Sequence, residues 1–278
     1  MATSSRIHLT PLTGTELPHH KDIPSDGDKL PDLQTFLAEV LAEGDRFMST
    51  TLHDGKVFKV GDVKHQPPAK AAIQIRSAVI PHQPTENWFA RTSVHEDAAT
   101  DGTATWAEFD GNLRADHSDH EKDYTPSVLS AQKEYSWEQD IQAFGATAGT
   151  WQDITMEIRL MRHKMPVFFL KDREFRVLVI TARAQKWNRF IVVQIPVARN
   201  TIPETASKAG QQAVNAIYCS VETGELLDGK ITWSMGTASD AKGILPMALQ
   251  KTQMANAVAI DVSYFIKWRM DRRKSHAV

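Results

Sequence analysis

Hydrophobic and polar positions near the end of the chain follow the 3.6-residue period of a helix. Six apolar positions, spaced i, i+3, i+4, i+7, i+10 and i+11, share one face: Ala255, Val258, Ala259, Val262, Phe265 and Ile266. Pro246 suits a first helical turn and no Pro or Gly follows it, so we predict a single helix over 246–269. Alanine in place of leucine on this face indicates either close packing on a sheet or a space left open beneath the helix.

Shorter apolar runs earlier in the chain have the length and composition of strands. We predict strands over 71–80, 88–95, 128–138, 154–161, 175–182, 190–197, 214–221 and 230–235. The turn at 185–188 is too short for a crossover helix, which makes its two strands antiparallel, and 222–225 is predicted to be a further turn. Helices are predicted over 31–44, where Gly44 would end the helix, and over 102–117. The predicted fold class is α+β, a curved antiparallel sheet with the long helix packed against it.

Composition indicates one soluble globular domain with tails. Of the 278 residues 41% are hydrophobic and 24% are charged, and the net charge of −2 gives no reason to expect a nucleic-acid partner. We expect a mobile N-terminal tail over 1–30, a domain over 31–270 and a basic C-terminal tail over 271–278. The polar first 30 residues lack a signal-peptide pattern, and Cys219 is the sole cysteine, so a cytoplasmic protein without disulfides is expected.

Three short motifs, in order along the chain, carry a family resemblance. They are Glu-Lys-Asp-Tyr-Thr-Pro-Ser-Val at 121–128, Asp-Arg-Glu-Phe at 172–175, and Asp-Ala-Lys-Gly-Ile-Leu-Pro at 240–246. Their order and spacing over 88–269 resemble START lipid-binding domains. The segments 88–96 and 106–124 are similar to a START-like family of unknown function that is found mainly in fungi. The resemblance implies a helix-grip fold, in which a curved sheet wraps the terminal helix around an apolar cavity.

The function that this resemblance implies is binding of a hydrophobic small molecule or lipid in the cavity. Two alternatives stay open: a START-like enzyme that cyclises a polyketide-type or other secondary-metabolite substrate, and an interaction module with a filled core. Sterol-carrying members have a buried Arg whose counterpart here would fall near Val179, which is apolar. The polar end of the cavity must therefore be built differently in this chain.

Candidate cavity residues come from three places in the sequence. Arg91, Ser93 and His95 alternate along one strand and share a face, which is either exposed to solvent or the polar end of the pocket. His95, with Glu96 or Glu121, is the candidate general base of an enzyme. The other candidates are the strand residues Val179, Trp233 and Met235 and the helix residues Ala255, Val258, Ala259 and Val262.

An apolar run between cationic residues is the candidate lid of the cavity. Met165, Val167, Phe168, Phe169 and Leu170 lie where START domains carry the loop over the cavity mouth, so this run either touches a ligand tail or a membrane, or forms a buried strand.

Charged clusters offer two further candidates. The basic residues Lys267, Arg269, Arg272, Arg273 and Lys274 suit a helix C-terminus, or a transient contact with anionic lipid. His117 and His120 share a helix face but lack a third ligand, so no metal is expected. Because the chain has no phosphate loop, nucleophile elbow or Cys-x-x-Cys motif, no cofactor is expected either.

Overall fold

The computed structural model describes residues 5–24, 29–81, 85–165, 171–201, 203, 213–240 and 247–276. Within these residues the strands are β1 (Lys59–His65), β2 (Ala72–Ile80), β3 (Glu86–Glu96), β4 (Val128–Ser136), β5 (Trp151–His163), β6 (Arg173–Ala184), β7 (Arg189–Pro196), β8 (Val214–Leu227) and β9 (Lys230–Asp240). The α-helices are α1 (Leu33–Ser49), α2 (Trp106–Phe109), α3 (His117–Tyr124), α4 (Glu138–Ala143) and α5 (Met247–His276). Short helical turns are η1 (Gly14–Glu16), η2 (Thr51–His53), η3 (Asp110–Arg114) and η4 (Arg199–Thr201).

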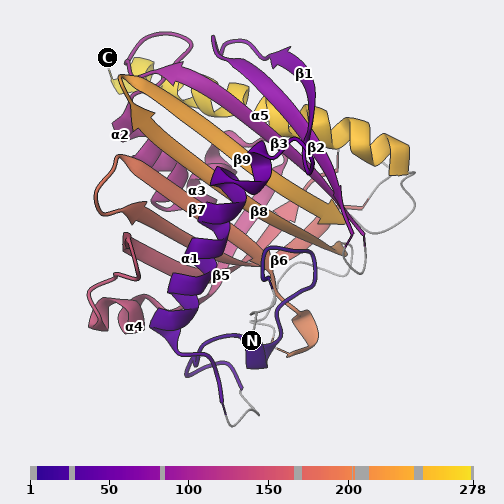
Figure 1. The fold of residues 1–278 in the computed structure, drawn as a ribbon, viewed down its shortest axis with the longest axis vertical. Helices are drawn as coiled ribbons and strands as arrows, with labels where there is room; N and C mark the ends of the chain where they lie inside the picture. Colours follow the sequence, from indigo (N-terminus) through magenta and orange to yellow (C-terminus); the bar gives the residue numbers. More distant parts are fainter. Residues whose placement is uncertain are drawn as a thin grey trace.

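All nine described strands form one sheet in the order β1-β2-β3-β9-β8-β7-β6-β5-β4. Neighbours in this order are antiparallel, and the first three strands of the chain join the last one through the pairing of β3 with β9. In Figure 1 the sheet curves around α5, which lies behind it against β2 and β3, whereas α1 crosses the opposite face. This is the predicted α+β helix-grip fold, with the strands of 175–235 antiparallel and one long helix packed on the sheet.

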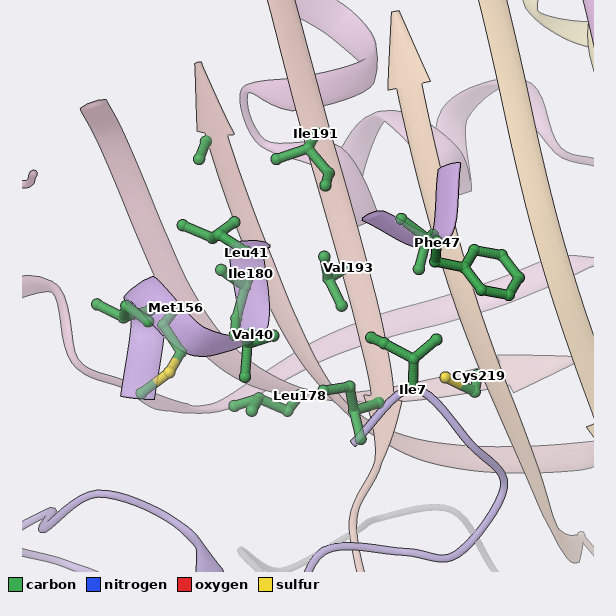
Figure 2. Close-up of a cluster of buried hydrophobic side chains, with 14 of the residues drawn as sticks. Ile7, Val40, Leu41, Phe47, Met156, Leu178, Ile180, Ile191, Val193 and Cys219 are labelled. Atoms are coloured by element: carbon green, nitrogen blue, oxygen red, sulfur yellow. The ribbon is translucent and has the colours of Figure 1, made fainter. Parts of the chain in front are cut away.

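The helix α1 covers one face of the sheet and forms what we call the α1-side core. Figure 2 shows Val40 and Leu41 of α1 among Ile180, Ile191 and Val193 of the sheet. The prediction that Gly44 ends this helix is wrong, since α1 continues to Ser49. A Cβ at Gly44 would lie 2.9 Å from Cγ2 of Val193, so the glycine allows close approach of the helix to β7.

The described part of the N-terminal segment packs onto the same face, so the expectation of a mobile tail is wrong for residues 5–24. Ile7, Leu9, Leu12, Leu17 and Ile23 are buried in the α1-side core. Backbone hydrogen bonds from Leu12 to Pro196 and from Ala198 to Leu12, both 2.8 Å, attach the segment to the end of β7. Buried apolar residues spaced irregularly among polar ones have no helix or strand period, which is why the sequence pattern did not reveal them.

Several elements of the structure differ from the predicted ones. β8 continues through 222–225, and the turn falls at Asp228 and Gly229, both of which have positive φ. The predicted helix over 102–117 is α2 followed by the π-helical turn η3, and left-handed Asp116 starts the separate helix α3. β1 escaped prediction because it is a largely exposed edge strand with few apolar residues. Residues 271–276 continue α5 rather than forming a tail.

A second core, which we call the α5-side core, lies between the sheet and α5. It contains side chains from the α2–η3 segment, from the strands and from α5, among them Phe109, Leu113, Val177, Val192, Trp233, Val262 and Phe265. The predicted cavity residues therefore lie on the face of the sheet that α5 covers.

Candidate ligand-binding site

Alternation along β3 turns its polar residues towards α5. Trp88 and Ala90 belong to the α1-side core, whereas Arg91, Ser93 and His95 occupy the other face. Their exposed fractions are 1%, 1% and 2%, so this face is buried and is not exposed to solvent. Because a buried polar side chain needs partners, the contacts of these residues define the centre of the candidate site.

Arg91 is paired with Glu222 across an intervening strand. Both residues are register partners of Met235 on β9, which places all three side chains on one face. Nη2 of Arg91 donates to Oε1 of Glu222 at 3.1 Å, and the indole N–H of Trp233 donates to the same oxygen at 2.6 Å. The guanidinium carbon lies 3.9 Å from the centre of the Trp233 ring. Sequence reasoning missed Glu222 because it assigned 222–225 to a turn; the alternation through Tyr218 and Ser220 was the available signal.

The guanidinium of Arg91 is only partly satisfied. Nε and Nη1 are buried and find no hydrogen-bond acceptor among the residues that the structure describes. Buried N–H groups of a charged side chain are costly to leave unpaired. Two nitrogens of the Arg91 guanidinium therefore stay without an acceptor in the described chain.

His95 is held as a neutral imidazole. Its Nε2 lies 2.8 Å from Oγ of Ser93, and its ring packs between Phe109 and Trp233. Burial, assisted by the positive charge of Arg91, lowers the pKa of His95 to about 3. Glu96 forms an ion pair with exposed Lys230, and the acid group of Glu121 lies 3.7 Å from Nε2 of His117, not against His95. A base with so low a pKa is poorly matched to proton transfer near neutral pH.

Two carboxyl groups near Arg91 carry raised pKa values. Burial raises the pKa of Asp261 on α5 to about 7; the charge of Arg91 opposes this effect, and those of Glu121 and Glu222 add to it. Burial also raises the pKa of Glu121 on α3, although the nearby His117 acts in the opposite direction. Asp261 forms no hydrogen bond or ion pair with the described part of the chain. Sequence reasoning missed Asp261, which is a single acid beside an apolar helix face.

A chain of hydrogen bonds connects α3 to the sheet beside these acids. The hydroxyl of Tyr218 donates to Oε1 of Gln194, whose Nε2 lies 3.1 Å from Nε2 of His117. Nδ1 of His117 lies 2.5 Å from the carbonyl oxygen of Leu113, so Nδ1 carries the proton and Nε2 accepts from Gln194. Nδ1 of His120 in turn meets the carbonyl of Ala115 at 2.9 Å. His117 and His120 therefore each form a hydrogen bond with a backbone carbonyl.

The predicted apolar residues of the site meet in the α5-side core. Val179, Trp233, Val258, Ala259 and Val262 are buried there, and Met235 and Ala255 pack against it while remaining partly exposed. Of the predicted lid, Met165 is partly exposed, and Val167, Phe168, Phe169 and Leu170 lie outside the described residues.

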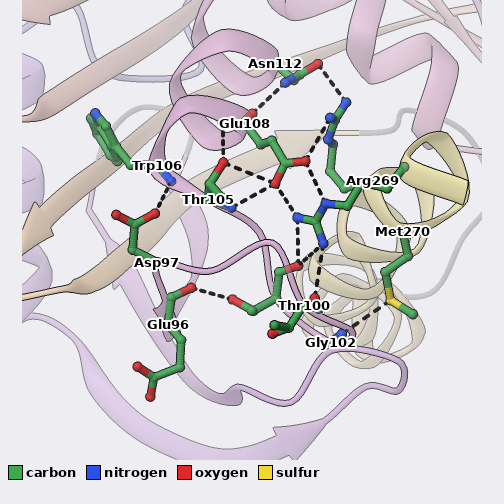
Figure 3. A network of polar contacts seen from close by, with 12 residues as sticks. Glu96, Asp97, Thr100, Gly102, Thr105, Trp106, Glu108, Asn112, Arg269 and Met270 are labelled. Atoms are coloured by element: carbon green, nitrogen blue, oxygen red, sulfur yellow. Dashed lines mark hydrogen bonds and ion pairs between the residues drawn. The ribbon is translucent and has the colours of Figure 1, made fainter. Parts of the chain in front are cut away.

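Ion pairs anchor the C-terminal part of α5 beside the site. Figure 3 shows Arg269 of α5 beside Glu108 of α2, and Nη2 of Arg269 lies 2.9 Å from Oε1 of Glu108. Nε of Arg273 lies 2.8 Å from the same oxygen. The backbone N–H of Thr105 donates to Oε2 of Glu108 at 2.8 Å. Lys267 pairs with Asp271, and Arg272 lies 3.8 Å from Asp123. Much of the predicted basic cluster thus holds α5 in place.

Comparison with known sequences connects this site to a family. A family model described as "Protein of unknown function (DUF3074)" matches residues 88–269, which is well over half of the chain. The chain belongs to this family. The matched range of the DUF3074 protein contains Arg91, Glu121, Glu222 and Asp261. None of the curated proteins compared with it matches its sequence.

Solved structures share the fold of the DUF3074 protein. Human StAR-related lipid transfer protein 5 matches with a TM-score of 0.60 and 11% identity, over 87% of this chain and 100% of its own. Human STARD10 matches with a TM-score of 0.58 and 10% identity, over 90% and 84%. A STAR-related lipid transfer protein from Xanthomonas axonopodis matches with a TM-score of 0.50 and 10% identity, over 75% and 97%. The fold is thus that of START domains, as the sequence motifs indicated.

Helices of the described residues also bear on membrane insertion. None of them combines the length and the apolar run that are needed to cross a bilayer.

Proposed function

We propose that this protein binds a hydrophobic small molecule or a lipid between the curved sheet and α5. The apolar walls are the residues of the α5-side core. The polar end, a name we use for Arg91, Glu121, Glu222 and Asp261, would lie beside these walls and is contributed by β3, α3, β8 and α5.

The observation that carries this proposal is that Glu121 and Asp261 are surrounded by protein and yet keep accessible surface. Burial is the largest cause of the raised pKa values of Glu121 and Asp261, so protein surrounds both carboxyls. Both residues nevertheless keep accessible surface, and that of the Glu121 side chain is 21%. Residues that are surrounded by protein and still accessible are where we expect a space for a ligand, and the partly unpaired guanidinium of Arg91 belongs to the same cluster of charged groups.

The structural relatives support the same class of ligand. Two of the proteins that share the fold are described as StAR-related or STAR-related lipid transfer proteins. Because their sequence identity is 11% or less, they support a hydrophobic ligand as a class and leave its head group to the residues of this chain.

We extend the proposal to the segment 165–170 as a lid. Its apolar side chains would touch the ligand tail, or a membrane surface during exchange. Its sequence, Met-Pro-Val-Phe-Phe-Leu between cationic residues, supports this role.

Titration with the neutral fluorescent probe N-phenyl-1-naphthylamine tests the proposal. The wild-type protein should bind the probe with an increase in probe fluorescence and with quenching of tryptophan emission, since Trp233 lies in the α5-side core. Met235→Trp places a large ring between Arg91 and Glu222 and should reduce the affinity at least about tenfold by occupying the space. Val94→Trp adds the same ring at an exposed position of β3 and is the matched control. Equal probe binding by all three proteins would contradict this location.

A second candidate, an enzyme that uses the same space, is favoured by one observation. Asp261 has a pKa of about 7, which suits a general base near neutral pH, and the unpaired N–H groups of Arg91 could stabilise a developing oxyanion. Recovery of a bound molecule chemically unchanged after prolonged incubation supports a carrier, whereas conversion that Asp261→Asn abolishes supports the enzyme.

A further inference from the structure

The polar end carries more acidic groups than its single cation can balance. Arg91 and Glu222 pair with each other, with Nη2 and Oε1 3.1 Å apart. Glu121 and Asp261 remain, and Asp261 has no ion pair with any described residue. Among the charged groups of the described residues that influence Asp261, Arg91 is the one cation, and Glu121 and Glu222 are both acids. An additional negative charge in this region would be repelled.

The unpaired N–H donors of Arg91 indicate which kind of ligand head group the polar end would bind. This side chain is 1% exposed, and its Nε and Nη1 are unpaired within the described structure, so both require an acceptor. The excess of acidic groups would attract a cationic head, but such a head offers no acceptor oxygen to Arg91 and would place a second positive charge beside the guanidinium. An uncharged oxygen, in contrast, can accept from Arg91 without adding charge.

We propose that the polar end selects ligands whose head is uncharged and carries an acceptor oxygen, such as an alcohol, ketone, ester or amide, and that Asp261 excludes anionic heads. This inference rests on the proposed function, and it names the class of ligand that the same site would accept. Asp261 would thus determine specificity, because its negative charge would repel an anionic head group bound beside Arg91.

Proton binding by Asp261 predicts how the exclusion of anionic heads should depend on pH. The titratable and charged groups that act electrostatically on this carboxyl, or on which it acts, are Arg91 on β3, Glu222 on β8, and Glu121 and Tyr124 on α3. Since the pKa of Asp261 is about 7, its negative charge is mostly present at pH 8 and mostly absent at pH 6. The exclusion of anions should therefore weaken as the pH falls.

Three probes with one ten-carbon chain and fixed head-group charges test the inference. Decanol, decanesulfonate and decyltrimethylammonium are each titrated against the bound N-phenyl-1-naphthylamine at pH 8, decanol below its solubility limit and the two charged probes below their micellar concentrations. Decanol should bind at least about tenfold more tightly than decanesulfonate, because nearby like charges in a poorly solvated site repel strongly. Lowering the pH to 6 should raise the decanesulfonate affinity at least about threefold and leave the decanol affinity unchanged.

Two variants of α5 complete the test. Asp261→Asn should bind decanesulfonate more tightly than the wild type at pH 8 and should lose the pH dependence. Asp271→Asn removes an exposed acid of the same helix, paired with Lys267, and should behave as the wild type. Tightest binding of either charged probe, or an unchanged preference in Asp261→Asn, would overturn the inference while leaving the proposed function intact. Failure of all three probes to displace the bound N-phenyl-1-naphthylamine would overturn the inference, whereas failure of the protein to bind that probe would overturn the proposed function.

Discussion

Arg91 and Glu222 form a buried ion pair although their strands are not neighbours. β9 lies between β3 and β8, and Met235 is the register partner of both residues. The two side chains pass over the strand between them, with Nη2 and Oε1 3.1 Å apart, and Trp233 supports both groups. This arrangement places a charged pair at the centre of a largely apolar layer.

Breaking this pair should destabilise the fold strongly. Glu222→Ala leaves the guanidinium of Arg91 buried without a counterion, so we expect a loss of about 3–5 kcal/mol in the free energy of unfolding. Urea denaturation measures this loss. Glu225→Ala, on the exposed end of the same strand, is the control and should change stability by less than about 0.5 kcal/mol. A cost below about 1 kcal/mol for Glu222→Ala would show that Arg91 is solvated in the folded protein.

Two alanines of α5 should respond differently to enlargement. Ala259 is fully buried in the α5-side core, so Ala259→Leu should cost about 1–3 kcal/mol by overpacking. Ala255 is partly exposed, so Ala255→Leu should cost less than about 1 kcal/mol and should weaken binding of N-phenyl-1-naphthylamine. Denaturation and probe titration of both variants separate these effects. Equal destabilisation by the two changes would mean that Ala255, too, serves close packing.

The anchor of α5 on Glu108 predicts a dependence of stability on pH. Burial raises the pKa of Glu108, but hydrogen bonds from Arg273, Thr105 and Arg269 outweigh it and lower the pKa to about 2. Because its pKa is lower in the folded state, ionised Glu108 stabilises the fold at pH values above its ordinary pKa of 4.5. This contribution is lost as the pH falls towards 2.

We therefore expect Glu108→Gln to be less stable than the wild type by about 1–2 kcal/mol at pH 6, a figure reduced for solvent screening. The difference should shrink steadily below about pH 4.5 in parallel urea denaturation series. Glu138→Gln, which removes an exposed acid of α4, should show no such trend. A difference that stays constant down to pH 3 would mean that the ionised carboxyl does not contribute.

Substitution of the proposed lid should affect binding more than stability. Phe168→Ser combined with Phe169→Ser should weaken N-phenyl-1-naphthylamine binding or association with liposomes, with the melting temperature nearly unchanged. Trp187→Ser removes an aromatic side chain that is 69% exposed in the β6–β7 turn, and it controls for the loss of surface aromatics. A loss of several kcal/mol in the double variant would identify the run as core, because truncation of buried Phe has that cost.

Periodicity in the sequence was sufficient for the layers of the fold. The apolar face of 255–266 and the strands of 175–235 have strong local patterns, and the structure confirms them. The order of three motifs then identified the START-like arrangement. Gly44 was misread because a glycine that ends a helix and one that allows close packing look alike in a sequence.

The polar end was less predictable because its partners are distant in the chain. Arg91 and Glu222 are separated by 131 positions, and an arginine on a strand gives no local sign that it is buried. Asp261 lies next to Val262 in a helix, where a lone acid usually faces solvent. The curvature of the sheet over α5 brings the three together, and that geometry depends on the whole fold.

Native mass spectrometry after exposure to lipid tests the central claim most directly. The 278-residue chain is incubated with vesicles made from a total lipid extract, separated from them by flotation, and ionised under non-denaturing conditions. We predict one bound lipid or other apolar molecule per chain for the wild type and for Val94→Trp, and mostly unbound protein for Met235→Trp. If the wild-type protein shows only the mass of the ligand-free chain, binding of a hydrophobic ligand between the sheet and α5 is contradicted.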